Sequence, residues 1–412
     1  MDRKRIVITG VGVVAPNGIG KEAFWQALKE GRSGIKPITL FDTSPFLTKQ
    51  AGECSDFSPE EHLGSKGLRN LDRATKLVLS ATKLALEDSG YILTDQNRDD
   101  TGVVTATTLS VINNISEFTK EAQDAGPQFV NPAAFPGTTI NSPSSQISIR
   151  FGIKAFNSTV STGYTASLDA LKYAADFIEL GRAKAVLVAG VEALFFQSFL
   201  GFNKLEFLAG IKGEEISCPF DKRRNGIILA EGAGAILLED AAAAQKRNAR
   251  IYGQLNAVKT FFDPFRTGKY NPKADGLKRA MQAVLKDAGI EPSSVDYILA
   301  AANSVVNQDA FETRVIKETF GNRASKIPVS AIKSMIGESI SAAGILQIIA
   351  GIGAMEHQIL WPTINYKEKD PKCDLDCVPH KSRKGTVNTV LINDFGPGGN
   401  NASALFSRWH NE

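Results

Sequence analysis

The sequence predicts an α/β protein built from two similar halves. Stretches rich in β-branched residues alternate along the chain with stretches whose apolar residues recur at helical spacing, which is typical of α/β architectures. In addition, one strand–helix–strand plan occurs twice, over residues 158–190 and again over residues 328–392. Residue identity between the two copies is slight, so the repeat is one of pattern. The pattern predicts a duplicated fold.

The first half opens with an expected buried strand, Arg5–Val14, rich in valine and isoleucine. A helix is predicted over Asp72–Leu86, with Gly90 as its stop, because its apolar and small residues follow helical spacing. Gly102–Ala106 is expected to be a short strand. Pro127–Pro143 shows no periodicity, so we expect it to be irregular and to have a functional or interfacial role.

The two copies of the repeated plan each contain one long helix. In the first copy, a helix over Tyr164–Leu180 has one apolar face, and the strand Ala185–Gly190 follows it. In the second copy, the helix Ser339–Met355 is apolar nearly all round, so we expect it to be buried at the centre of the protein. The strand Val387–Ile392 follows.

The junction between the halves is expected near residues 250–259. The segment Ala230–Glu239, with its small glycine residues, would close the first half. We therefore predict an N-terminal domain over residues 1–255 and a C-terminal domain over residues 256–412.

The composition is that of a globular protein, with 43% hydrophobic and 22% charged residues. The 47 lysines and arginines exceed the 44 acidic residues by only three, which leaves no electrostatic footprint for nucleic acid. Four cysteines in 412 residues do not form a disulfide framework. No apolar run reaches the ~18 residues of a membrane span, and the apolar run after the charged start of the chain is too short for the core of a signal peptide. We therefore expect a soluble cytoplasmic protein that binds neither nucleic acid nor membrane.

Several motifs follow one another in a fixed order along nearly the whole chain. They are RIVITGVGVVAPNG at 5–18, PFD at 219–221 with Arg224, AEGAGAILLE at 230–239, IKS at 332–334, CDLDCVP at 373–379 and FGPGGNNASALF at 395–406. With these motifs the chain resembles the β-ketoacyl synthases of fatty-acid and polyketide synthesis. The resemblance implies a duplicated thiolase fold, five-layered α-β-α-β-α with two similar halves.

The resemblance also implies a particular catalytic apparatus. In that family a cysteine at a helix N-terminus is acylated, two histidines assist decarboxylation of a malonyl thioester, and two backbone N–H groups form an oxyanion hole. At the matching positions this chain has Tyr164 for the cysteine, Asn303 and Glu338 for the histidines, and Pro397 where an N–H would be donated. A phenol with a pKa of about 10 is a poor acyl acceptor at neutral pH. We therefore expect no condensation by this chain alone.

Other family positions are retained and are expected to support the fold. They are Lys333, Asp309, Glu312, Gly398 and Gly399. We expect Glu338 to form a salt bridge with Lys333, because the two are five residues apart around a turn.

This combination resembles the chain length factor, the inactive partner of an active ketosynthase in type II polyketide synthases. The resemblance implies a heterodimer with an active β-ketoacyl synthase, an acyl carrier protein as partner, and a role in setting polyketide or polyene chain length. Tyr164 departs from that group's commoner glutamine. By position, Phe129, Phe135 and Thr138 are candidates for a tunnel or its interface with the partner.

Other interpretations remain open. The chain could instead be an acyltransferase or hydrolase of altered chemistry using Tyr164, or a homodimeric module that binds acyl groups or carrier protein. Cys373, Cys377 and His380 suggest a zinc site, but the spacing is untypical and no second ligand pair is present. The glycines at 10 and 12 lack the rest of a dinucleotide fingerprint. We therefore predict no cofactor and no metal.

Overall fold

The computed structural model describes residues 4–265 and 275–410 of the chain. Its centre is a mixed sheet of eleven strands in these described residues, with the order β11-β10-β14-β15-β9-β1-β8-β7-β5-β6 and β2 paired to β1. The strands of the first half are β1 (Ile6–Ala15), β2 (Gly18–Ile19), β5 (Thr101–Ala106), β6 (Asn157–Val160), β7 (Ala185–Glu192) and β8 (Gly232–Asp240). Those of the second half are β9 (Gly253–Phe262), β10 (Tyr297–Leu299), β11 (Val329–Ser330), β14 (Thr389–Phe395) and β15 (Asn400–Ser407).

The two halves of the sheet repeat one topology. In the first half, β5 runs parallel to both β6 and β7, and β7, β8 and β1 then pair antiparallel. In the second half, β10 runs parallel to both β11 and β14, and β14, β15 and β9 then pair antiparallel. The duplication that the repeated pattern predicts is therefore confirmed. The halves join where β1 pairs antiparallel with β9, Ile6 lying opposite Leu255.

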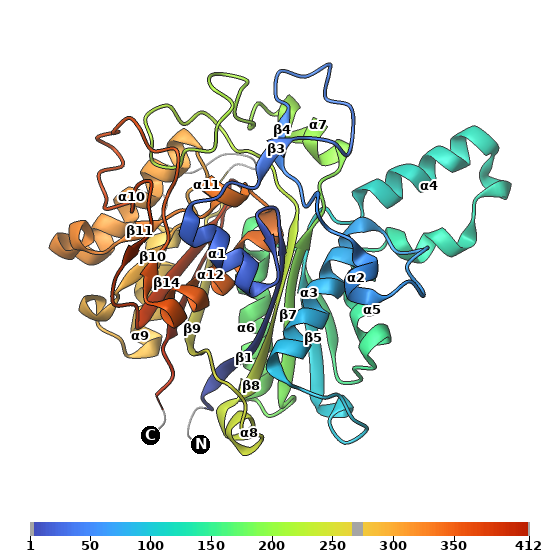
Figure 1. The fold of residues 1–412 in the computed structure, drawn as a ribbon, viewed down its shortest axis with the longest axis horizontal. Helices are drawn as coiled ribbons and strands as arrows, with labels where there is room; N and C mark the ends of the chain where they lie inside the picture. Colours follow the sequence, from blue (N-terminus) through green and yellow to red (C-terminus); the bar gives the residue numbers. More distant parts are fainter. Residues whose placement is uncertain (1–3, 266–274, 411–412) are drawn as a thin grey trace.

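Helices cover both faces of this sheet and fill the space between its halves (Figure 1). The helices are α1 (Lys21–Glu30), α2 (Pro59–Leu63), α3 (Arg73–Ser89), α4 (Ile112–Ala125), α5 (Ser142–Phe151), α6 (Ala166–Glu179), α7 (Phe196–Lys204), α8 (Ala241–Lys246), α9 (Gly276–Ala288), α10 (Val306–Phe320), α11 (Lys333–Ile336) and α12 (Ala343–His357). The helices α6 and α12 contact strands of both halves and lie in the middle, whereas α3 and α9 cover the outer faces. Two small antiparallel sheets of two strands each lie outside the main sheet: β3 (Ile35–Pro37) with β4 (Gln50–Gly52), and β12 (Ile359–Leu360) with β13 (Arg383–Lys384).

The helix α12 is the buried central helix that its sequence predicts. Every residue from Ala343 to Met355 is buried. By length and composition alone, the stretch Ile340–His357 is the one segment of the described chain that could cross a membrane, but 89% of it is enclosed by the protein. Its apolar surface therefore serves packing between the two halves of the sheet.

The helix α3 begins and ends at the residues that the sequence indicates. Asp72 caps its N-terminus by accepting a hydrogen bond from the Thr75 amide, and Gly90 closes it in the left-handed conformation. The helix lies directly against β1, because Gly10 and Gly12 there carry no side chain. A Cβ atom on Gly12 would fall 2.0 Å from the carbonyl oxygen of Ala81. The glycines of the first strand are therefore required by close packing.

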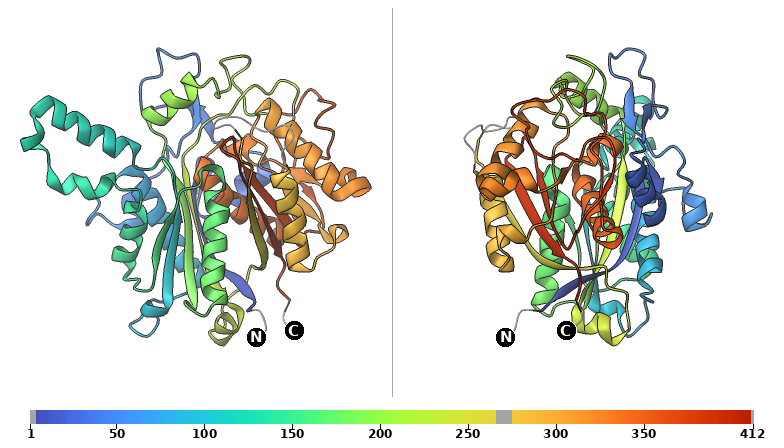
Figure 2. Two further views of the ribbon diagram at one scale, coloured as in Figure 1. Left: turned by 180° about the vertical axis from the view of Figure 1, so that it is seen from behind. Right: turned by 60° about the vertical axis from the view of Figure 1, so that its left-hand side comes forward.

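A helical arm is the main element that the sequence analysis does not predict. The helix α4 has no buried residue and, with the short 3-10 helices η2 (Pro127–Phe129) and η3 (Pro132–Thr138), extends away from the body of the protein. Seen from behind, the arm projects on the left (Figure 2). The segment expected to be irregular thus consists of η2, η3 and the start of α5.

We predict opposite effects of alanine at two glycines. Gly12→Ala should lower the free energy of unfolding by about 3 kcal/mol or more, because its Cβ would collide with the backbone of α3. Gly201→Ala, in α7, should raise the free energy of unfolding by about 0.5–1 kcal/mol, because nothing lies within 4 Å of the added atom. Urea unfolding monitored by circular dichroism measures both. Equal effects of the two substitutions would contradict the close packing of α3 on β1.

Candidate functional site

The candidate site lies where the N-termini of α6 and α12 meet. A single 3-10 turn, Gly163–Thr165, precedes α6, and another, Ile340–Ala342, precedes α12. The Ser167 hydroxyl donates a hydrogen bond to the carbonyl of Ser341 (2.5 Å), and the Ser341 hydroxyl donates to the carbonyl of Gly163 (3.1 Å). These bonds tie the two helix N-termini together, although the residues that form them lie more than 170 positions apart in sequence.

Tyr164 stands in the first of these turns, at the position where the resembling family has its cysteine. Its side chain is 9% exposed and packs in an apolar cluster with residues that include Leu194, Phe199 and Ile340. The ring lies against the backbone of Gly396, where an added Cβ would come within 2.4 Å of the Tyr164 Cδ2 atom. The tyrosine ring therefore fills space in front of the α6 N-terminus.

The phenol of Tyr164 is held neutral. Burial raises its pKa well above the usual value of 10, and the nearby carboxyl groups of Glu338 and Asp394 raise it further. A neutral phenol is a weak nucleophile, so the geometry offers no activated oxygen at this position. It does offer a hydroxyl that can donate a hydrogen bond.

A buried ionic cluster lies beside Tyr164. The Lys333 ammonium donates hydrogen bonds to Glu338 Oε2 (2.9 Å) and to the carbonyl of Ala301 (3.1 Å). Asn303 Nδ2 donates to the same Glu338 oxygen (2.8 Å), and the amide of Ile340 donates to the other one (2.9 Å). The salt bridge expected between Glu338 and Lys333 is confirmed. Asn303 and Glu338, which stand where the family has its two histidines, are thus hydrogen-bonded to each other.

The protonation of Lys333 is secured by its neighbours. Burial alone would lower its pKa, but the attraction of Glu338 and Asp394 outweighs burial and raises the pKa above its usual value. The ammonium therefore stays charged, and Glu338 has a cation as its partner. The cluster is a closed set of hydrogen bonds rather than a group of donors directed at a substrate carbonyl.

Asp394 is a functional-site residue that the sequence analysis missed. It is fully buried at the end of β14, and its Oδ1 atom lies 3.8 Å from Lys333 Nζ. Burial raises its pKa well above the usual value. A charged residue at the end of an otherwise apolar strand is the signal that could have identified it.

The retained acidic pair holds the backbone that carries Asn303. Glu312 accepts hydrogen bonds from the amides of Ala301 (3.0 Å) and Ala302 (2.9 Å) and from the side chain of Asn393 (3.0 Å). Asp309 accepts from the amide of Asn303 (3.0 Å). Burial raises the pKa of Asp309 to about 6 and that of Glu312 to about 7. Both carboxyl groups position main chain and do not face the ring of Tyr164.

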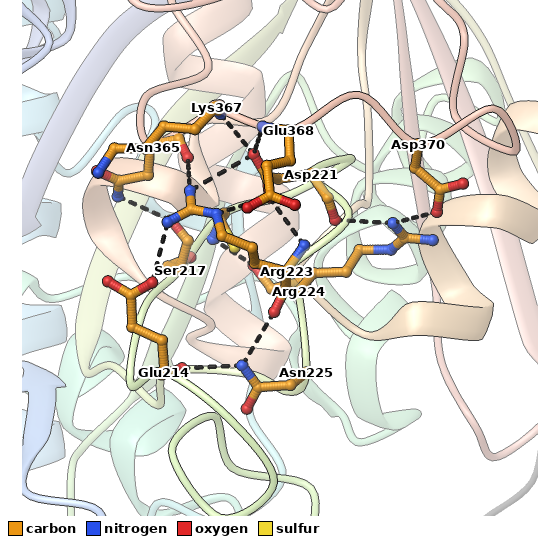
Figure 3. Close-up of polar contacts among 12 residues, drawn as sticks. Glu214, Ser217, Asp221, Arg223, Arg224, Asn225, Asn365, Lys367, Glu368 and Asp370 are labelled. Carbon is orange, nitrogen blue, oxygen red and sulfur yellow. Dashed lines mark hydrogen bonds and ion pairs between the residues drawn. The ribbon is translucent and has the colours of Figure 1, made fainter.

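A second ionic network joins two loops near this backbone (Figure 3). Asp221 accepts hydrogen bonds from Arg223 and from the amides of Lys367 and Glu368. The buried Arg224 donates to Asp370 Oδ2 (2.7 Å) and to the carbonyl of Asp221 (2.8 Å). The PFD motif with Arg224 therefore acts as a structural link between the loops at 217–225 and 365–370.

The loop after β14 contains Pro397, which has no N–H to donate. Gly399 adopts a positive φ of 94°, and an added Cβ there would fall 2.4 Å from the carbonyl oxygen of Asp263. Gly398 has no such restriction, because nothing lies within 4 Å of an added Cβ. Of the two retained glycines, only Gly399 is required by the backbone.

Glu192 is a second residue that the sequence analysis missed. It is buried at the end of β7 and accepts hydrogen bonds from the amides of Thr108 (2.6 Å) and Leu109 (3.1 Å). The Thr108 hydroxyl is in turn hydrogen-bonded to the hydroxyl of Ser341 (2.6 Å), which also bonds to the turn that contains Tyr164. Burial raises the pKa of Glu192 to about 7. Its carboxyl group connects β5, β7 and the start of α12.

The tunnel candidates lie on the arm and not in the cluster around Tyr164. Phe129 is 68% and Phe135 is 58% exposed, and the Thr138 hydroxyl donates to the carbonyl of Phe135. Phe135 contacts the ring of Phe118, also on the arm, at 5.9 Å between centroids. Within this chain the structure therefore does not bring Phe129, Phe135 and Thr138 to Tyr164.

None of the four cysteines offers an activated thiol. Cys54, Cys218, Cys373 and Cys377 are free and buried, and burial raises the pKa of Cys373 to about 12 and that of Cys377 to about 11. In the part of the chain that the structure describes, no three His, Cys, Asp or Glu side chains are grouped to hold a metal ion. The thiols therefore lack the thiolate character that ligation or nucleophilic attack requires.

The fold is the thiolase-like α/β fold of the ketosynthases. The models of the β-ketoacyl synthase N-terminal and C-terminal domains match residues 3–244 and 252–367. The chain belongs to the β-ketoacyl synthase family. The duplicated thiolase fold that the resemblance implies is confirmed, whereas the boundary predicted at residue 255, which falls inside β9, stays a prediction.

Curated relatives match along the full length. The chain is 36% identical over 411 residues to 3-oxoacyl-[acyl-carrier-protein] synthase 2 of Coxiella burnetii, with 99% of each chain covered. It is 34% identical to the protein of the same name from Synechocystis sp., again with 99% of each covered.

Solved structures agree in fold. The ishigamide ketosynthase/chain length factor superposes with a TM-score of 0.92 and 31% identity over 99% of this chain and 100% of that one. A second solved structure superposes with a TM-score of 0.91 and 28% sequence identity, again over 99% of this chain and 100% of that one. It is a type II polyketide synthase acyl carrier protein in complex with its ketosynthase bound to the hexaketide.

These relatives correct the function predicted from sequence. The prediction of a chain length factor, a degenerate subunit that sets chain length, is contradicted because the curated relatives at 32–36% identity are 3-oxoacyl-[acyl-carrier-protein] synthases. The physical reason is that the four substituted positions (Tyr164, Asn303, Glu338 and Pro397) report only on the chemistry of the site. The match to those synthases, in contrast, extends over 98–99% of this chain. The ishigamide ketosynthase/chain length factor is named for both kinds of chain, so the likeness to it does not decide between them.

We predict that the Lys333–Glu338 pair is coupled. Lys333→Met should lower the free energy of unfolding by about 3–5 kcal/mol, because it leaves the buried Glu338 without its cation. Adding Glu338→Gln should restore most of this loss, since Asn303 can turn its unpartnered oxygen toward the new amide. The control is Lys172→Met in the exposed pair with Asp176, where the expected change is below about 0.5 kcal/mol. Additive effects of the two buried substitutions in urea titrations would contradict the coupling.

We predict that Glu192 makes stability depend on pH. Its folded-state pKa is raised from 4.5 to about 7, so its stabilising contribution is complete below pH 4.5 and is lost as the pH rises to 7. Glu192→Gln should reduce the fall in the free energy of unfolding between pH 4.5 and 7 by up to about 3 kcal/mol. Urea titrations of both proteins between pH 4.5 and 8 measure the difference, with the exposed Glu22→Gln as control. Parallel curves for the wild type and Glu192→Gln would refute the assignment.

Proposed function

We propose that this protein acts in the extension of acyl chains carried by an acyl carrier protein. The observation that carries the proposal is the match to 3-oxoacyl-[acyl-carrier-protein] synthases over 99% of both chains. Carrier protein as a partner is supported by the solved ketosynthase complex that contains one. Fatty-acid or polyketide synthesis is the setting that both kinds of relative support.

We further propose that a second ketosynthase-fold chain supplies the thiol for this reaction. Extension through a covalent acyl intermediate requires a reactive thiol, yet position 164 holds a neutral phenol and the four cysteines are buried with raised pKa values. The thioester would then be formed on the partner, while this chain contributes binding surface. The proposal concerns the source of the thiol and assigns no control of chain length.

The surface proposed for this partner consists of β6 and the arm. The strand β6 ends the order of the main sheet, so one side of its backbone is open to pairing. The arm, which contacts α5 where α5 packs on β6, exposes Phe129, Phe135 and Ile115. Exposed apolar side chains next to an open strand edge are typical of a surface that is covered in an assembly.

We also propose a cytoplasmic location. The four free cysteines, none of them in a disulfide in the described structure, support a reducing compartment.

The test is co-expression with a ketosynthase from the same source, followed by an extension assay with acyl- and malonyl-carrier protein. We expect the two chains to co-purify, and we expect extended product only from the pair. Phe129→Asp on the arm should weaken the pairing at least about ten-fold, since a charge would be buried there. Leu180→Asp, on the equally exposed C-terminal end of α6, should leave it unchanged.

Each outcome of this experiment bears on a separate part of the proposal. Product from this chain alone would overturn the need for a partner thiol and leave the acyl-extension role intact. No processing of carrier-bound acyl groups by any combination would overturn the role itself.

A further inference from the structure

The arm that the proposed partner would cover has no buried anchor in the body of the protein. No residue of α4, η2 or η3 is buried, and the contact between the rings of Phe118 and Phe135 lies within the arm itself. A cavity of about 320 Å³ lies between the arm and the loop at residues 69–72. Burial of apolar surface therefore contributes little to the direction of the arm. That direction depends on the polar contacts at its neck, where both ends of the arm leave the body (Figures 1 and 2).

Asn114, in the first turn of α4, joins three segments at this neck. Its Nδ2 atom donates hydrogen bonds to Asp72 Oδ2 (2.7 Å) and to the carbonyl of Gly137 (2.7 Å). Gly137 lies near the end of η3, where the arm returns to the body. Both protons of one side-chain amide are thus used, one toward the body and one toward the returning segment.

The anchor on the side of the body is held in place. Asp72 caps α3, since its Oδ1 atom accepts a hydrogen bond from the Thr75 amide (2.6 Å), and α3 lies against β1 and β8. A hydrogen bond to a carboxylate is shorter and stronger than one between neutral groups. The bond from Asn114 to Asp72 therefore ties the arm to a fixed point.

Two further contacts at the neck hold only the outgoing side of the arm. Gln197 Nε2 on α7 donates to Asn113 Oδ1 (3.2 Å). Glu192 accepts a hydrogen bond from the amide of Thr108, which precedes α4. Neither contact reaches the returning segment. Of these three contacts, the one made by Asn114 is therefore the one that closes the neck.

We propose that Asn114 is the positioning residue of the arm, and that its two hydrogen bonds fix the direction in which Phe129 and Phe135 face the partner chain. The inference rests on the proposed pairing with a second ketosynthase-fold chain and adds to it the residue that prepares the surface before the partner binds. A surface that is already in place loses less conformational entropy on association than one that the partner must order. Asn114 acts on pairing through the arm and takes no part in the chemistry.

The direction of the arm can be measured as the distance between two spin labels. Ala125→Cys at the end of α4 and Glu87→Cys near the end of α3 place the labels at exposed positions on the arm and on the body. The four native cysteines are buried and do not compete for the label. Double electron–electron resonance then gives the distance distribution for the chain alone and for its complex with a ketosynthase from the same source.

Asn114→Asp keeps the size of the side chain and removes both donor protons. The new carboxylate would face the acceptor oxygens of Asp72 and Gly137. We expect the distance distribution of the free chain to become at least about two-fold broader. Pairing with the ketosynthase, measured by calorimetry, should weaken about ten-fold. Thermal melts establish that each variant is folded.

The control is Asn113→Asp, which makes the same change in charge one position earlier on the same helix. Because Asn113 accepts a hydrogen bond from Gln197, an aspartate there keeps the contact. We expect neither the distance distribution nor the pairing to change. Equal effects of Asn113→Asp and Asn114→Asp would assign the loss to the added charge and would overturn the inference.

An exchange of the two bonded side chains tests the bond itself. In the double variant Asp72→Asn with Asn114→Asp, the new asparagine can still accept from the Thr75 amide and can donate to the new carboxylate. We expect a narrower distance distribution and tighter pairing than in Asn114→Asp alone. Equal or greater losses in the double variant would show that this bond does not set the direction of the arm.

The two readouts separate the inference from the proposed function. An unchanged distance distribution in Asn114→Asp overturns the inference. A broader distribution with unchanged pairing also overturns it, because the direction of the arm would then not matter to the partner. Both results leave the proposed function in place as long as the wild type pairs. Failure of the wild type to pair with the ketosynthase overturns the proposed partner and this inference together.

Discussion

The antiparallel pairing of β1 with β9 is the constraint on which the rest of the structure depends. It joins two half-sheets of identical topology into one, so that the repeated helices α6 and α12 are enclosed between them. Both helices are buried side by side, and hydrogen bonds join the turns at their N-termini. Tyr164, Ser341 and the Lys333 cluster therefore meet, although they come from opposite halves of the chain.

The buried charges at this meeting point satisfy one another. Lys333 is bonded to Glu338, Asn303 is bonded to the same carboxylate, and Glu312 with Asp309 holds the main chain that carries Asn303. A buried carboxylate in place of a histidine would be costly alone, but here its cation and two further donors compensate for burial. The substitutions relative to the family pattern thus form one consistent set. Asp394 is buried beside this set, with its Oδ1 atom 3.8 Å from Lys333 Nζ.

The contrast between local site and whole chain explains why the predicted function was wrong. The absence of a cysteine at position 164 and of an N–H group at Pro397 describes the local chemistry. At position 164 the structure places a neutral phenol. This local chemistry does not identify the subgroup, because the curated relatives match this chain over 99% of its length and not at these positions alone.

The sequence by itself determined the α/β class, the duplication, the central position of α12 and the ends of α3, because apolar periodicity and capping residues act over short distances along the chain. It also determined that no cysteine stands at position 164. Only the tertiary structure decided that α4 forms an exposed arm and that Asp394 and Glu192 lie beside the cluster around Tyr164 and Lys333. The physical reason is that burial and hydrogen bonding depend on distances in space. Partners such as Gly163 and Ser341 lie 178 positions apart in sequence, so no local pattern specifies their contact.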